Sequence, residues 1–136
     1  MIYLIDTNII SECIKKNPNS KVIDWLKKVD INNCSISVLT LGEIRKGIEK
    51  LDCPIKKQKI IQWLETDLLI QFSGRILDIG PKVADKWGYI TSFCSIPAID
   101  ALIAASALVY NQKIVTRNVK DFENIIGLEV VNPFNS

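Results

Sequence analysis

The chain has 136 residues, 48% of them hydrophobic, and its 17 basic and 15 acidic side chains leave a net charge of +2. This length suits a single domain with one sizeable core, so we expect one domain over residues 1–136. The balanced charge excludes the strongly basic surface of a protein that wraps duplex DNA, but it permits a nucleic-acid substrate.

Several features that the sequence lacks exclude further classes of protein and of active site. The apolar start at residues 1–5 reaches Asp6 too early for a secretory signal, and the longest apolar run, 101–110, is shorter than the roughly 20 residues of a membrane span. Histidine is absent, which excludes Ser-His-Asp and Cys-His catalysis and His-bound metals. The cysteines form no C-x-x-C pair and indicate reduced thiols in a cytoplasmic protein: Cys13, Cys34, Cys53 and Cys94.

Short apolar strands and a helix are predicted in the first third of the chain. Residues 2–5 form a continuous apolar run, which is typical of a buried strand in a parallel sheet, and a second strand is predicted at 34–38. Between them, apolar residues at helical spacing over 22–29 predict a helix with Asn19 or Ser20 as its N-cap. The first connection is therefore strand, helix, strand.

The middle of the chain shows a helical period. Apolar residues keep a 3.6-residue repeat from Thr40 to Pro54 and again over 60–68, which predicts two helices. Gly74 then indicates a turn, and residues 76–79 a strand or extended segment.

Two prolines and two strands organise the last part of the chain. Pro81 and Pro97 are each predicted to open a helix, and the second helix is apolar nearly all round, so it belongs in the interior. Residues 113–116 and 129–131 are predicted strands. This alternation predicts an α/β fold with a parallel sheet of four to five strands flanked by helices.

Polar residues directly after the strands are the first candidates for a functional site, because ligands of an open α/β sheet bind at the carboxyl ends of its strands. Taken singly, each has an ordinary explanation as a helix cap, a solvated helix residue or a turn residue. The candidates are Asp6 with Thr7 and Asn8, Glu43, Asp100, and Asn118 with Asp121.

Asp100 is the most unusual of these acids, because it lies near the start of the helix that is otherwise apolar on every side. A buried unpaired carboxylate costs several kcal/mol, and the helix dipole offsets only about 0.3–1 kcal/mol. No basic residue occurs between Ser95 and Gln112, so its partner comes from elsewhere in the fold. A metal ion is a simple candidate.

Several oxygen ligands at one sheet edge, without histidine or cysteine, describe a site for a hard cation such as Mg²⁺ or Mn²⁺. Clustered carboxylates repel one another and raise one another's pKa, so such a cluster is stable as anions only with a cation. The grouping therefore predicts metal dependence.

The order of these residues resembles the PIN domain, in particular its VapC type, and the similarity covers essentially the whole chain. The residues that carry it are Ile5-Asp6-Thr7-Asn8, Glu43, Ile99-Asp100-Ala101-Leu102-Ile103-Ala104-Ala105 and Val115-Thr116-Arg117-Asn118-Val119-Lys120-Asp121-Phe122. The resemblance implies a Mg²⁺- or Mn²⁺-dependent endoribonuclease, the toxin of a VapBC-type toxin–antitoxin pair. It further implies an RNA substrate, a homodimer, and a cognate antitoxin whose segment covers the acidic groove.

The resemblance also implies roles for single residues. Asp6, Glu43 and Asp100 form the acidic, metal-binding centre, at which water rather than a side chain attacks the phosphodiester. The family often carries a fourth acid in its last motif; here Asn118 is nearest to Thr116 and Asp121 follows three residues later. Asp121 is the expected fourth metal-site acid, directly or through water. Residues expected to orient water or substrate are Asn8, Thr116 and Asn118, and candidates to hold phosphates are Arg45, Lys46, Arg117 and Lys120.

Two other interpretations compete with a nuclease. A receiver domain shares the fold class, but it requires an acidic pair at the first strand, where Asp6 stands alone. A catalytically silent PIN fold that works as a binding subunit is the remaining alternative. The joint presence of the four acids argues against it, and metal binding separates the two.

Overall fold

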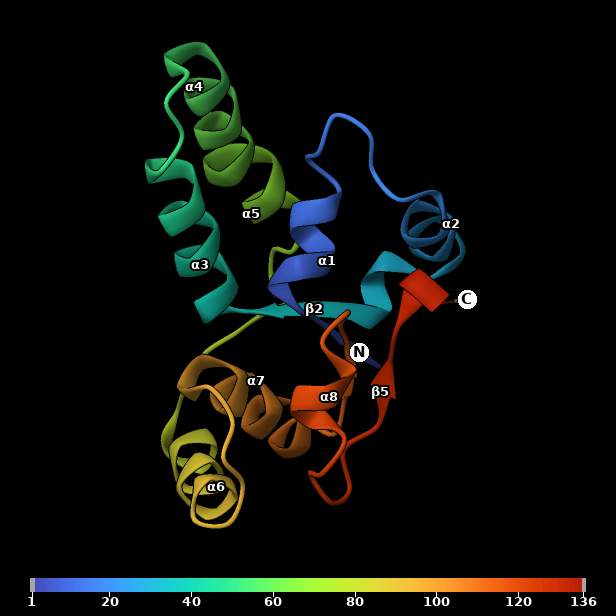
Figure 1. The fold of residues 1–136 in the computed structure, drawn as a ribbon, viewed down its shortest axis with the longest axis vertical. Coiled ribbons are helices and arrows are strands. Elements are labelled where there is room, and N and C mark those ends of the chain that lie inside the picture. Colours follow the sequence, from blue (N-terminus) through green and yellow to red (C-terminus); the bar gives the residue numbers. More distant parts are fainter. Residues whose placement is uncertain (1, 136) are drawn as a thin grey trace.

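The computed structural model describes residues 2–135, in which five short strands form one parallel sheet (Figure 1). The strands are β1 (Tyr3–Ile5), β2 (Cys34–Ser37), β3 (Ile76–Leu77), β4 (Lys113–Val115) and β5 (Val130–Val131). Their order across the sheet is β3-β2-β1-β4-β5, so the first strand of the chain is the central one. The predicted α/β fold with a parallel sheet of four to five strands is confirmed.

The register of the central strands determines which residues meet at the carboxyl edge of the sheet. Ile5 in β1 pairs with Val115 in β4, and the amide of Asp6 donates to the carbonyl of Val115 at 2.9 Å. The residues that follow these two strands, Asp6 and Thr116, therefore lie next to each other although 110 residues separate them.

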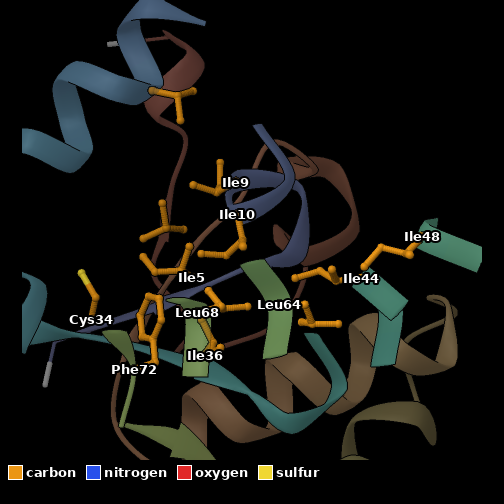
Figure 2. Packing of buried hydrophobic residues seen from close by; sticks show 12 residues of the cluster. Ile5, Ile9, Ile10, Cys34, Ile36, Ile44, Ile48, Leu64, Leu68 and Phe72 are labelled. Atoms are coloured by element: carbon orange, nitrogen blue, oxygen red, sulfur yellow. The ribbon is translucent and has the colours of Figure 1, made fainter. Parts of the chain in front are cut away.

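Side-chain alternation along the strands gives the sheet two apolar faces. Ile5 and Val115 belong to one buried cluster, shown in Figure 2 with side chains from α1, α3 and the segment before Phe72. Leu4 and Ile114, one residue earlier on each strand, belong to the cluster on the opposite face. Both faces are covered, which explains why the strands are apolar runs rather than alternating ones.

Helices cover each face of the sheet (Figure 1). On one side lie α1 (Thr7–Glu12), α2 (Ser20–Lys28), α3 (Val38–Glu49), α4 (Pro54–Gln62) and α5 (Leu69–Gln71), with a π-helical turn (Trp63–Leu68) between α4 and α5. On the other lie α6 (Pro81–Thr91), α7 (Ala98–Val109) and α8 (Val119–Phe122). Two 3₁₀ turns, Ile31–Asn33 and Pro133–Asn135, complete the described elements.

Most helix predictions are confirmed, with differences at their ends. Asn19 caps α2 through its side chain, as expected. The helix expected from Thr40 begins two residues earlier, because the Ser37 hydroxyl accepts the amide of Leu39 and caps it. The helix expected over 60–68 already begins at Pro54.

Two short helices, α1 and α8, were not predicted, because six and four residues are too few to show a helical period. Each begins shortly after a strand, α1 after β1 and α8 after β4, so residues such as Thr7 and Asp121 lie near the carboxyl edge. The interior position of α7 is confirmed, since residues such as Ala104 and Ala105 are fully buried. None of the helices described in residues 2–135 is both long and apolar enough to cross a membrane.

Candidate active site

Asp6 lies at the centre of the carboxyl edge, where β1 turns into α1. Its side chain is 4% exposed, and its Oδ1 accepts the amide of Thr7 at 2.8 Å as the N-cap of the helix. Oδ2 accepts the Thr116 hydroxyl at 2.7 Å and the Asn8 amide nitrogen at 3.1 Å. Burial raises the pKa of Asp6 and these hydrogen bonds oppose the rise.

Thr116 and Asn8 connect the loop after β4 with the start of α1. Nδ2 of Asn8 also donates to the Thr116 hydroxyl at 3.1 Å, and Oδ1 of Asn8 accepts the amide of Arg117 at 3.1 Å. The amide of Asn118 donates to the Thr116 hydroxyl at 3.1 Å. The loop after β4 is thus fastened to the start of α1, with the buried hydroxyl of Thr116 at the centre.

Glu43 reaches the site from α3 and is held by a threonine of α1. The Thr7 hydroxyl donates to Oε1 of Glu43 at 2.6 Å, and it lies 3.0 Å from the hydroxyl of Thr40, which is fully buried. Glu43 also acts on Asp6 electrostatically and contributes to the raised pKa of that carboxyl. The two acids are therefore close enough to repel each other.

Asp100 lies in the first turn of α7, on the other side of the sheet edge from α3. Burial is the largest of several effects that together raise the pKa of Asp100 to about 7. The others are hydrogen bonding to Asp121 and the charges of Asp6, Asp121 and Glu43. The structure thereby places Asp121, from α8, against Asp100. Asp121 therefore lies close to Asp100, while Asn118 lines the pocket.

A cavity of about 350 Å³ opens over these side chains. Its lining includes Asp6, Glu43 and Asp100 together with Arg117 and Phe134. A cavity of this size is at the lower end of the range for small-molecule sites. Three acids that are far apart in the sequence therefore share one solvent-accessible pocket.

Comparison with known proteins identifies the architecture of this site. The family model of the PIN domain matches residues 3–127. The chain belongs to the PIN-domain family. The toxin FitB of Neisseria gonorrhoeae is 34% identical to this PIN domain over 97% of the chain and 98% of its own length.

Other relatives share the whole length of the PIN domain. A VapC ribonuclease of Sinorhizobium fredii is 30% identical over 96% of both proteins. The crystal structure of FitAcB from Neisseria gonorrhoeae superimposes with a TM-score of 0.94, at 32% identity over 99% of this chain and 100% of that one. A toxin–antitoxin complex from Klebsiella pneumoniae gives a TM-score of 0.72 at 26% identity, over 96% and 97% of the two chains.

The donor set of this PIN domain fits a hard divalent cation, because the site offers carboxylate, hydroxyl and amide oxygens and no sulfur or imidazole. As they stand, no three His, Cys, Asp or Glu side chains within residues 2–135 are arranged to enclose a cation. Both oxygens of Asp6 and Oε1 of Glu43 face hydrogen-bond donors. A cation that binds to these oxygens would therefore compete with the hydrogen-bond donors that they now face.

Of the four basic candidates, Arg117 lines the acidic pocket, whereas Lys120 lines the neighbouring cavity and Lys46 another cavity along α3. Arg45 pairs with Glu49 at 3.4 Å and with Glu65 at 2.7 Å, so its charge is already compensated. Thr7 was a candidate from the sequence without an assigned role, and Thr40 and Phe134 were not among the candidates. Thr7 and Thr40 had only a capping or helical signal, and nothing in the sequence linked Phe134 to the pocket.

Proposed function

We propose that this PIN domain is a metal-dependent endoribonuclease and the toxin of a VapBC-type toxin–antitoxin pair. The convergence of Asp6, Glu43 and Asp100 at one pocket, with Asp121 interacting with Asp100, carries the proposal. The names of the relatives, a FitB toxin and a VapC ribonuclease, agree with it.

In this proposal Asp6 and Asp100 hold the cation, and Glu43 and Asp121 accept hydrogen bonds from the water molecules around it. A bound Mg²⁺ or Mn²⁺ would supply a Lewis acid that makes water more acidic and offsets negative charge on the scissile phosphodiester. Attack of water at phosphorus breaks the bond to the leaving oxygen, and the carboxylates of the chain take the proton that the water loses. RNA is the substrate.

The hydrogen-bonded side chains around the acids have a positioning role. Thr116 and Asn8 keep the Asp6 carboxylate in one orientation, and Thr7 does the same for Glu43. Asn118, exposed at the rim, is placed to contact substrate or orient water. None of these groups titrates near neutral pH, so they maintain the geometry throughout the reaction.

The proposal includes two protein partners. One is a cognate antitoxin whose segment covers the acidic pocket, in agreement with the toxin–antitoxin complex from Klebsiella pneumoniae. The other is a second copy of the chain, as in the VapC type that the sequence resembles. Analytical ultracentrifugation of the purified chain, with and without the product of the neighbouring gene, measures both associations.

The decisive test is cleavage of a mixed RNA pool by purified protein with Mg²⁺, with Mn²⁺ and with EDTA. Discrete fragments that disappear with EDTA and in Asp6→Asn establish the nuclease. Asp6→Asn is a matched control, because it keeps the side-chain volume and removes the charge. Absence of cleavage with either metal, once a co-purified inhibitor has been excluded, would favour a silent binding subunit.

A further inference from the structure

Arg117 and Phe134 lie against each other on the wall of the acidic pocket. The guanidinium carbon of Arg117 is 4.8 Å from the centre of the Phe134 ring, a cation–π contact. Both side chains line the 350 Å³ cavity that also contains Asp6 and Asp100. We call this pair the Arg117–Phe134 platform.

Arg117 differs from the other two arginines of the chain in its contacts. Arg45 pairs with Glu49 and Glu65, and Arg75 donates hydrogen bonds to the carbonyls of Cys34 and Gln71. Within residues 2–135 the guanidinium of Arg117 forms no hydrogen bond or salt bridge. Arg117 is exposed, so its donors and its outer face are available to a ligand.

The position of Phe134 is fixed by its backbone and by packing against the core. The residue lies in the 3₁₀ turn Pro133–Asn135, its amide donates to Oδ1 of Asn132 at 3.0 Å, and its ring packs against the buried cluster around Ile5. The ring is half-buried, with part of it in the pocket wall. The platform is therefore preorganised, which reduces the entropy lost when a planar ligand binds.

The surroundings of the platform suit single-stranded nucleic acid. A second cavity, of about 430 Å³, adjoins the first one and shares Arg117 and Asn118 with it. Lys120, Asn132 and Asn135 also line this cavity and can donate hydrogen bonds to phosphate and base oxygens. The second cavity is of mixed charge, because Asp121 lines it together with Arg117 and Lys120, whereas the first contains Asp6, Glu43 and Asp100.

We propose that the Arg117–Phe134 platform binds a nucleobase of the RNA substrate by stacking, beside the phosphate that is cleaved. Proteins bind unpaired RNA bases on aromatic rings and on guanidinium planes, and a stacking contact accepts any base. The inference rests on the proposed ribonuclease activity. It assigns Phe134, outside the acidic motifs, as a substrate-binding residue.

Steady-state cleavage of a short RNA containing a mapped site tests the platform. Phe134→Leu keeps the apolar packing and removes the aromatic face, so we expect KM to rise about 5- to 100-fold with little change in kcat. Phe134→Trp keeps the aromatic face and should stay within a few-fold of the wild type. Tyr110→Leu is the matched control: this exposed aromatic residue follows the opposite end of α7 from Asp100.

A substrate with an abasic residue gives a second and independent measurement. Abasic residues are introduced one at a time on either side of the cleaved bond, and KM is measured for wild type, Phe134→Leu and Arg117→Ala. At one position we expect the abasic substrate to raise the KM of the wild type relative to the intact substrate. For the two variants, the same abasic substrate should change the KM little. Such non-additivity is the sign of a direct contact.

The outcomes separate this inference from the proposed function. If wild type cleaves RNA but Phe134→Leu and Arg117→Ala keep the wild-type KM, the platform does not bind substrate. The same conclusion follows if the abasic effects simply add to those of the variants. If wild type cleaves no RNA with any metal, the nuclease proposal itself fails, and the platform proposal with it.

Discussion

The hydroxyl of Thr7 donates a 2.6 Å hydrogen bond to Oε1 of Glu43, across 36 residues of sequence. It connects the first turn of α1 to the middle of α3, and the buried Thr40 hydroxyl supports it at 3.0 Å. The backbone amide of Thr7 also donates a hydrogen bond to Oδ1 of Asp6. One threonine therefore sets the orientation of two of the four acids.

Thr7→Val should impair the nuclease because it removes this hydroxyl while preserving the side-chain shape. We expect RNA cleavage to fall about 10- to 100-fold, the usual effect of losing a group that orients a metal ligand. Thr7→Ser should recover most of the activity, because serine restores the donor. Equal losses in the two variants would show that the methyl group rather than the hydroxyl matters.

Asp100 should make the stability of the metal-free protein depend on pH. Burial, then hydrogen bonding to Asp121 and the neighbouring charges, raises the pKa of Asp100 from its ordinary 3.8 to about 7. Between these values the folded chain binds more protons than the unfolded chain, so the free energy of unfolding decreases as pH rises. Asp100→Asn should therefore gain stability relative to wild type between pH 5 and pH 8, measured by urea unfolding in EDTA.

The control for this experiment is Asp24→Asn, which alters an exposed carboxyl on α2 and should show no such gain. A stability difference between Asp100→Asn and wild type that is the same at both pH values would contradict the assigned pKa.

Mn²⁺ should stabilise the folded protein and release protons as it binds. A ligand that binds only the folded state at about 100 times its Kd contributes roughly 2.7 kcal/mol to the free energy of unfolding. Because the raised pKa of Asp100 favours a bound proton below about pH 7, affinity should be higher at pH 8 than at pH 6. Calorimetry in two buffers of different ionisation enthalpy counts the protons, and Asp6→Asn should abolish the binding heat.

Thr116→Val should cost stability as well as activity. Its hydroxyl donates to Asp6 at 2.7 Å and accepts from the amide of Asn118, and the side chain is fully buried. Removing one donor from a buried carboxylate costs about 1–3 kcal/mol, which denaturant unfolding can resolve. Thr116→Ser retains the hydroxyl and should remain close to wild type; a loss as large as that of valine would refute the hydrogen-bond explanation.

The parts of this molecule that sequence reasoning could predict are those with a strong local signal. The apolar runs at β1 and β4 predicted parallel strands, and polar residues after strands predicted the carboxyl edge. Asp100 was identifiable because a single acid in an apolar helix is energetically costly. The pairing of Ile5 with Val115 then accounts for the meeting of Asp6 and Thr116.

The parts that could not be predicted depend on contacts between distant segments. α8 has four residues and no period, so the sequence could not decide between Asn118 and Asp121. Phe134 reaches the pocket only because β5, two residues long, pairs with β4. Thr7 looks like an ordinary helix residue until α3 is placed beside it.

The position of β1 at the middle of the sheet has a consequence for the synthesis of the protein. The strand β1, which leads into Asp6, is synthesised well before its neighbour β4 and the Thr116 hydroxyl. A fragment from a stalled or prematurely terminated ribosome has Asp6 without the partner that orients it. The orientation of the Asp6 carboxylate therefore depends on a segment that is synthesised about 110 residues later.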